Sequence, residues 1–253
     1  MNATQKDRWE KRGKRASMVA VMEQARVNLT LGRTHEAILA NFGWTAESTA
    51  RLSEKVAALD QRFSARALIM DASKNAAKEE RRRLEEAKTF MSRVRTAAPM
   101  VLRNHPAPGV TDDAFKIGEP LGRSTPKHIK YLMRIRPFVE TLEDQLKPFF
   151  GKESPLEQLD AVKSELEKSD AEQETLRGSL PAETQKIVEQ TGEIFELIDH
   201  MNRIARLAFQ DSPEVAAQFN TNLIQRAARS GRKIELVEEL PENDEAGELE
   251  EAV

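Results

Sequence analysis

The side chains best suited to catalysis or metal binding are the four histidines, His35, His105, His128 and His200, in a chain without cysteine. The missing cysteine excludes a thiol nucleophile, a disulfide framework and a cysteine-ligated metal. Glu196 and His200 lie four residues apart, but a di-iron bundle needs Glu-x-x-His on two helices together with partner glutamates. We therefore expect His200 to be structural or exposed, and His35 and His128 to lie on helix surfaces.

Sequence motifs of common enzyme classes are absent. The chain contains no Gly-x-Gly-x-x-Gly, no Gly-rich loop ending in Gly-Lys-Ser/Thr and no Gly-x-Ser-x-Gly. Carboxylates are abundant, but their spacing is that of solvated helix faces. A buried carboxylate pair with displaced pKa values would indicate an enzyme, and burial is not visible in a sequence. We predict a protein that is not an enzyme, with no catalytic residue, cofactor or metal.

Basic side chains are concentrated in two places. The first is a track on an expected helix: Arg81, Arg82, Arg83, Lys88, Arg93 and Arg95. The second is a cluster near the C-terminus: Arg226, Arg229, Arg232 and Lys233. Such side chains bind phosphates without regard to sequence. However, the first track is interleaved with Glu79, Glu80, Glu85 and Glu86, which favours pairing within the helix, and few aromatic residues lie near it for base stacking. Nucleic acid is therefore the alternative partner.

The two ends of the chain carry opposite charge. Residues 1–125 hold 23 basic and 15 acidic side chains, whereas residues 126–253 hold 16 and 27. Most of the second imbalance comes from Glu235 to Val253, the acidic tail, which has nine acidic residues and no basic one. Such blocks are either solvated ends or interaction segments. On the second interpretation the tail docks on a basic surface of its own chain or of a neighbouring copy.

The two tryptophans have different surroundings in the sequence. Phe42 and Trp44 flank Gly43 at an expected helix corner, where a contact that fixes the turn is the ordinary interpretation. An exposed anchor for a partner is the other interpretation, because Trp is enriched at interface hot spots. Trp9 lies among charges, outside any apolar stripe, and we therefore expect it to contact a partner.

Helical periodicity dominates the first half of the chain. Apolar residues recur at spacings of three and four in three stretches, within 16–42, 52–70 and 84–101. No Gly or Pro occurs between Thr45 and Ala98, so one continuous helix is possible there. The polar segment Asp71–Asn75 is the turn that we favour in this stretch. Residues 104–126 then contain a dense set of turn formers, with a short helix expected from Thr111 to Phe115.

The second half shows the same pattern. A helix is expected over residues 126–150, with a kink or break at Pro137. Ser154-Pro-Leu-Glu157 has the spacing of a helix start, and Gly178-Ser-Leu-Pro181 reads as a turn. A last helix should begin at Asp211–Glu214 and end near Gly231.

The two halves resemble each other along the chain. Leu52 and Leu59 correspond to Leu159 and Leu166, and Met91 corresponds to Met201. We therefore expect an all-α protein of two tandem antiparallel bundles, each with three to four helices, related by internal duplication. The expected organisation is a basic extension (1–15), a first bundle (16–103), a connector (104–126), a second bundle (127–231) and an acidic C-terminal segment (232–253).

These features together favour a helical scaffold that binds proteins and self-associates through its oppositely charged ends. The partner-binding residues that we expect are the following: Trp9, Lys11, Arg12, Arg15, Arg81, Arg82, Arg83, Glu238, Glu239 and Glu242. A nucleic-acid-associated protein regulated by its acidic tail is the alternative. No apolar run reaches the roughly 18 residues that a membrane span needs, and the first residues lack the apolar core of a secretory signal. We therefore expect a cytoplasmic protein without a membrane partner.

Overall fold

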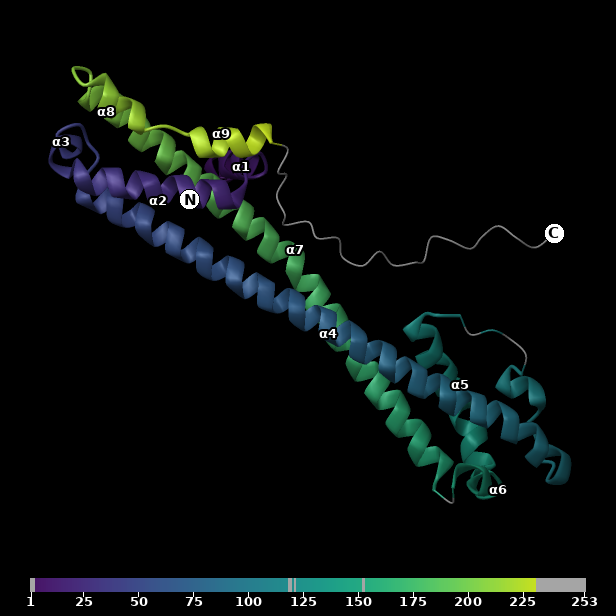
Figure 1. Ribbon diagram of the computed structural model, residues 1–253. Coiled ribbons are helices and arrows are strands. Elements are labelled where there is room, and N and C mark those ends of the chain that lie inside the picture. The colour runs from purple at the N-terminus through teal and green to yellow at the C-terminus, as the bar shows by residue number, and fades with distance from the viewer. Residues whose placement is uncertain (1–2, 118–119, 121, 152, 231–253) are drawn as a thin grey trace, which may run out of the picture. The chain divides into compact units, whose positions relative to one another are not determined.

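The computed structural model describes residues 3–117, 120, 122–151 and 153–230 (Figure 1). All regular structure in these residues is helical, which confirms the all-α prediction. The elements in chain order are α1 (Ala3–Gly13), α2 (Met18–Thr34), α3 (Glu36–Ala40), α4 (Ala46–Asn104), η1 (Asp112–Phe115), α5 (Thr125–Thr141), α6 (Glu143–Leu146), η2 (Lys147–Phe150), α7 (Pro155–Ala208), α8 (Pro213–Gln218) and α9 (Asn222–Arg229). The chain divides into two compact units, with boundaries at 67/68 within α4 and at 180/181 within α7.

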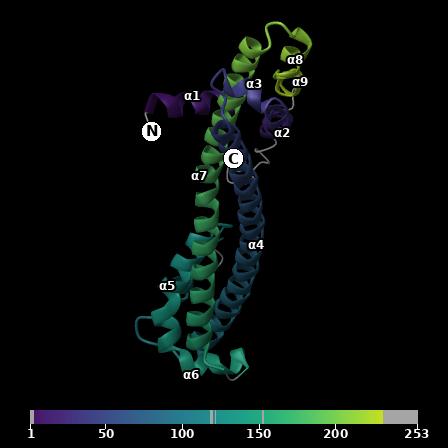
Figure 2. The same cartoon turned by 90° about the vertical axis from the view of Figure 1, so that its left-hand side faces the viewer.

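Unit 1 contains the described residues of 3–67 and 181–230. Its apolar core is built from α2, the first part of α4, the last part of α7, and α9. Within this unit α4 and α7 are antiparallel, because Lys55 pairs with Glu193 at 2.9 Å while Arg62, further along α4, pairs with Glu183 at 3.0 Å. Figure 2 shows the two ribbons side by side.

A buried polar chain fixes α9 on the core of unit 1. The amide of Gln24 donates to Asn28 at 3.0 Å, and Asn28 donates to Asn202 of α7 at 2.7 Å. Asn202 in turn donates to the Asn220 carbonyl at 3.0 Å, and the backbone N–H of Leu223 donates to Gln24 at 3.2 Å. Because buried amides are costly when unpaired, this chain of bonds specifies how α2, α7 and α9 fit together.

Unit 2 contains the described residues between 68 and 180. Its core combines the last part of α4, the first part of α7, η1, α5, α6 and η2. Leu132 and Ile135 of α5 and Leu159 of α7 are fully buried there. The hydroxyl of Tyr131 donates to the Phe115 carbonyl at 2.7 Å and thereby fixes η1 against α5.

The region 45–98 forms one helix, and the predicted turn at Asp71–Asn75 is wrong. α4 runs without interruption from Ala46 to Asn104, and Pro99 lies inside its last part. The polar segment reads as a solvated helix surface, since Asp71 and Asn75 are both exposed. The physical reason is that polar residues alone do not stop a helix, and the stretch from Thr45 to Ala98 contains neither Gly nor Pro.

The predicted turn at Gly178–Pro181 is also wrong, because α7 continues from Pro155 to Ala208. Pro181 removes one backbone donor, yet Leu180 beside it is buried and Ser179 bonds to the Leu176 carbonyl at 2.8 Å. Packing of the neighbouring side chain therefore outweighs the lost hydrogen bond. The helix α5 likewise passes through Pro137.

Several predicted helix ends are confirmed. Gly43 and Gly151 adopt left-handed backbone angles, with φ of +97° and +68°. The Ser154 hydroxyl accepts from the Glu157 backbone N–H at 3.2 Å at the start of α7, and η1 occupies the short helix expected after Thr111. Three expected helices are instead interrupted. The stretch 16–42 divides into α2 and α3 at His35, and the helix expected over 126–150 divides into α5, α6 and η2. The last expected helix divides into α8 and α9.

The arrangement as two tandem bundles is not confirmed. The predicted bundles covered 16–103 and 127–231, whereas each observed core draws residues from both halves of the chain. The cause is the unbroken course of α4. Because this helix does not fold back at Asp71–Asn75, its two apolar stretches do not pack on each other, and each packs on α7 instead. The acidic C-terminal segment lies outside the described residues.

Candidate functional site: a basic and aromatic groove on α4

The N-terminal helix α1 lies on α7 of its own chain. Trp9 is 7% exposed, and its indole N–H donates to Glu196 at 2.5 Å. The premise that no core receives Trp9 is therefore wrong. The signal that sequence reasoning missed is a pair of glycines, because a Cβ at Gly13 would meet the Val188 carbonyl oxygen at 1.9 Å and one at Gly192 would meet the Trp9 carbonyl oxygen at 1.8 Å.

Part of the N-terminal positive charge is neutralised at this contact. Arg12 pairs with Asp199 of α7 at 2.7 Å, and its guanidinium lies over the Phe195 ring at 5.1 Å from the centroid. Lys11 and Arg15 are exposed, and no carboxylate in the described part of the chain forms an ion pair with either. Of the three cations predicted here for partner binding, these two are therefore accessible.

The arginine track on α4 is mostly paired, as the interleaved glutamates predicted. Arg82 bonds to Glu79 at 2.5 Å and to Glu86 at 3.0 Å. Arg83 contacts the same two carboxylates and also Glu165 of α7 at 3.1 Å. The hydrogen bond from Arg82 lowers the pKa of Glu79 to about 2, so this carboxylate remains charged in all but strong acid. Arg81 is exposed and has no ion pair with any described carboxylate.

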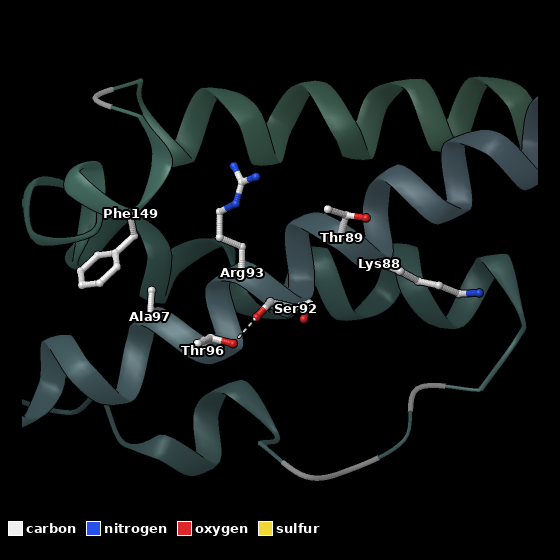
Figure 3. A pocket seen from close by; sticks show the side chains of 7 residues that line it. All are labelled: Lys88, Thr89, Ser92, Arg93, Thr96, Ala97 and Phe149. Atoms are coloured by element: carbon white, nitrogen blue, oxygen red, sulfur yellow. Dashed lines mark hydrogen bonds between the residues drawn. The ribbon is translucent and has the colours of Figure 1, made fainter.

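A groove lies one to four turns further along α4, within unit 2 (Figure 3). It has a volume of about 540 Å³. Its walls are formed by Lys88, Thr89, Ser92, Arg93, Thr96, Ala97 and Phe149. All but Phe149 come from α4, whose i, i+4 spacing brings them to one face. The lining thus combines two cations and three hydroxyls with an aromatic ring that is 42% exposed.

The two cations of the groove differ in their partners. Lys88 bonds to Glu85 at 2.7 Å, one turn away. The Arg93 guanidinium lies 5.4 Å from the centroid of the Phe150 ring, and among the described residues it forms no ion pair with a carboxylate. The ring holds the guanidinium through a cation–π contact without neutralising its charge. Arg93 can therefore accept an anionic partner.

The hydroxyl groups of the groove are mostly engaged with the helix backbone. Thr89 donates to the Glu85 carbonyl and Thr96 to the Ser92 carbonyl, each at 2.9 Å. A hydroxyl that donates in this way can still accept a hydrogen bond through its oxygen. Ser92 makes no side-chain hydrogen bond to other described residues, so its hydroxyl can donate to a bound acceptor. These groups can bind a polar ligand through hydrogen bonds.

The comparisons with known proteins add no constraint. No family model, no curated protein and no solved structure matches this chain. The assignment of a site therefore depends on the geometry alone.

Of the histidines, His128 departs most from the place expected for it. His128 was predicted on a helix surface but is 1% exposed, with Nδ1 at 2.8 Å from the Ser124 carbonyl oxygen. His35 packs edge-on against Phe209, with ring centroids 5.1 Å apart. His200 is exposed, as one of its two predicted roles required, and its ring lies 5.9 Å from that of Trp44.

Trp44 has the structural role that we took as the ordinary interpretation. It is 1% exposed and donates to the Thr49 hydroxyl at 2.9 Å, whereas Phe42 is exposed.

Within the described ranges, no group of three or more His, Asp or Glu side chains could hold a metal ion. No helix in these ranges combines the length and the apolarity needed to cross a membrane. The predicted residues Glu238, Glu239 and Glu242 lie outside the described residues.

Proposed function

We propose that the protein is a non-enzymatic helical scaffold that self-associates through opposite charges, with the acidic tail of one copy bound to a basic surface of the next. The observation that carries this proposal is the set of exposed cations without an ion pair in the described structure: Lys11, Arg15, Arg81 and Arg93. The acidic tail supplies nine carboxylates and no compensating base. Such a contact is heterologous, so it closes a ring or extends into a filament.

The structure changes which basic residues suit this role. Arg12, Arg82 and Arg83 already have carboxylate partners in their own chain. Binding the tail at one of these arginines requires its existing ion pair to be broken. Because exposed ion pairs are weak, the new pair with the tail would do little more than replace the old one. Cations without a partner gain a new attraction without that loss. The exposed cations on α4 and at the end of α1 therefore support the proposal better than the paired arginines.

Internal duplication is part of the same proposal. In each half, a helix of 17 residues is followed by a short helix, a glycine with positive φ and a long helix: α2, α3, Gly43 and α4, then α5, α6, Gly151 and α7, with the short helix η2 added before Gly151 in the second half. Residues matched by sequence are buried in both copies. Leu52 and Leu159 are each 0% exposed, and Met91 and Met201 are 1% and 0% exposed. The element order and the burial at matched positions support a common origin.

Sedimentation velocity on the full chain tests the scaffold. The wild-type protein is compared with E235Q/E238Q/E239Q/E242Q, which removes tail charge without shortening the chain. We expect the wild type to form oligomers at low salt and to dissociate as salt rises, because exposed charges are screened beyond about 10 Å at 0.1 M. The glutamine variant should be monomeric throughout. A wild-type protein that is monomeric at every salt concentration would refute self-association.

The alternative partner, nucleic acid, is tested with the same variant. If the acidic tail masks a phosphate-binding surface, neutralising the tail should reveal DNA or RNA binding that weakens steeply with salt. The pairing of Arg82 and Arg83 with glutamates argues against this alternative. A gel shift that shows no complex at low salt with the glutamine variant would dispose of it.

A further inference from the structure

The groove around Arg93 is lined by cations and by an aromatic ring but by no carboxylate. A second hollow of about 570 Å³ adjoins it and shares Thr89 and Arg93. This second hollow adds apolar lining from Phe90 and Val162, together with Glu85 and Glu86, whose carboxylates already pair with cations of α4. The combined surface therefore suits a ligand that carries both negative charge and aliphatic side chains.

One segment of this chain has that chemistry. Residues 234–242 read Ile-Glu-Leu-Val-Glu-Glu-Leu-Pro-Glu, with four carboxylates, four aliphatic side chains and no cation. We infer that this segment of one copy binds in the α4 groove of a second copy, with its carboxylates at Lys88 and Arg93 and its aliphatic side chains against Phe149. This inference rests on the proposed self-association and names its docking site.

Charge complementarity favours the acidic tail over other occupants. The basic α1 of another copy would meet Lys88 and Arg93 and be repelled. A nucleic acid backbone would satisfy the cations, but it would place phosphates near Glu85 and Glu86 of the adjoining hollow. The tail satisfies both parts of the groove, and its negative charge is directed chiefly to Arg93, which forms no ion pair among the described residues, whereas Lys88 already pairs with Glu85 at 2.7 Å.

The direct test is binding of a fluorescent synthetic peptide of residues 234–253, measured by anisotropy. The receptor is the full chain carrying E235Q/E238Q/E239Q/E242Q, so that its own tail does not compete. Adding K88E/R93E should weaken peptide binding about tenfold, because two attractive contacts become repulsive. The matched control is K127E/K130E, which changes two exposed cations of α5 in the same unit by the same charge and should leave the affinity unchanged.

Two further variants separate charge from apolar contact. A peptide with E238K/E239K should bind K88E/R93E more tightly than the unmodified receptor, since exchanging the charges restores attraction. F149S should weaken the wild-type peptide about fivefold through lost apolar contact, and it should leave the salt dependence of binding unchanged. If K88E/R93E binds the peptide as well as K127E/K130E does, the groove is not the docking site.

Sedimentation of full chains with the wild-type tail distinguishes the two proposals. K88E/R93E should be monomeric at low salt while K127E/K130E still assembles. If both assemble, self-association stands and the groove assignment is overturned. If the unmodified wild type is monomeric although the peptide binds the groove, docking between copies and the proposed scaffold are both overturned.

Discussion

The single tyrosine of the chain gives a direct test of the core of unit 2. Tyr131 is 4% exposed and donates its hydroxyl hydrogen to the Phe115 carbonyl at 2.7 Å. Burial raises the pKa of Tyr131 to about 12, and the nearby charges of Arg95 and Arg134 only partly oppose this rise. The folded protein therefore keeps the phenol protonated at pH values where an unfolded chain ionises it.

The stability effect follows from the two pKa values. A phenol in an unfolded chain has a pKa of about 10, so a folded pKa of about 12 corresponds to about 2.7 kcal/mol. Because the folded value is the higher one, this stabilisation is fully present below pH 10. It is lost as the pH rises from 10 to 12. The free energy of unfolding should fall by about 2–3 kcal/mol over this range through Tyr131 alone.

Phenolate absorbance in the near ultraviolet reports on this residue without interference from another tyrosine. In the folded protein the absorbance change should occur near pH 12, or together with unfolding as seen by circular dichroism. Y131F is the control. It loses the bond to Phe115, at a cost of about 1 kcal/mol at neutral pH, and its stability should fall less between pH 10 and 12. Reversible ionisation near pH 10 in a chain that remains folded would refute the assignment of Tyr131 to a closed core.

Two further predictions concern α1 and the core of unit 1. In G192A the new methyl would collide with the Trp9 carbonyl, so α1 should leave α7 and tryptophan emission should shift to the red. In G178A the methyl meets nothing within 4 Å, so urea denaturation should show a gain of about 0.5–1 kcal/mol. A red shift in both variants or in neither would contradict the close contact. N28A should lower the free energy of unfolding by about 1–3 kcal/mol, because Asn202 then has an unpaired buried oxygen; calorimetry showing no loss would contradict the network.

The apolar stripes of the helices could be predicted well from the sequence, because helical periodicity is a local signal. Leu52, Leu59, Leu159 and Leu166 were placed on buried stripes, and all four are fully buried. The partner of each stripe could not be predicted. That choice depends on whether a helix turns back, and no residue type at Asp71–Asn75 decides it. The prediction of two tandem bundles depended on the incorrect turn at Asp71–Asn75.

The candidate site was predictable in part for a related reason. The cations of α4 were visible as a track, and the interleaved glutamates correctly indicated that Arg82 and Arg83 are paired. The groove itself was missed because Phe149 reaches it from a distant part of the chain. Trp9 was misplaced because its contact on α7 depends on Gly192, and a glycine carries no apolar signal.

The accessibility of each cation matters more for docking than the number of cations in a segment. Residues 81–83 are the densest run of positive charge in the chain, yet two of its three arginines bind carboxylates of their own chain. Arg93 lies outside that run, and its guanidinium makes a cation–π contact with Phe150 and no ion pair among the described residues, which leaves its charge available. A partner with carboxylates therefore gains more at Arg93 than at the dense run. The scaffold proposal accordingly requires R93E to impair assembly more than R82E does, and equal effects on the salt-dependent mass would show that overall charge, not the groove, drives association.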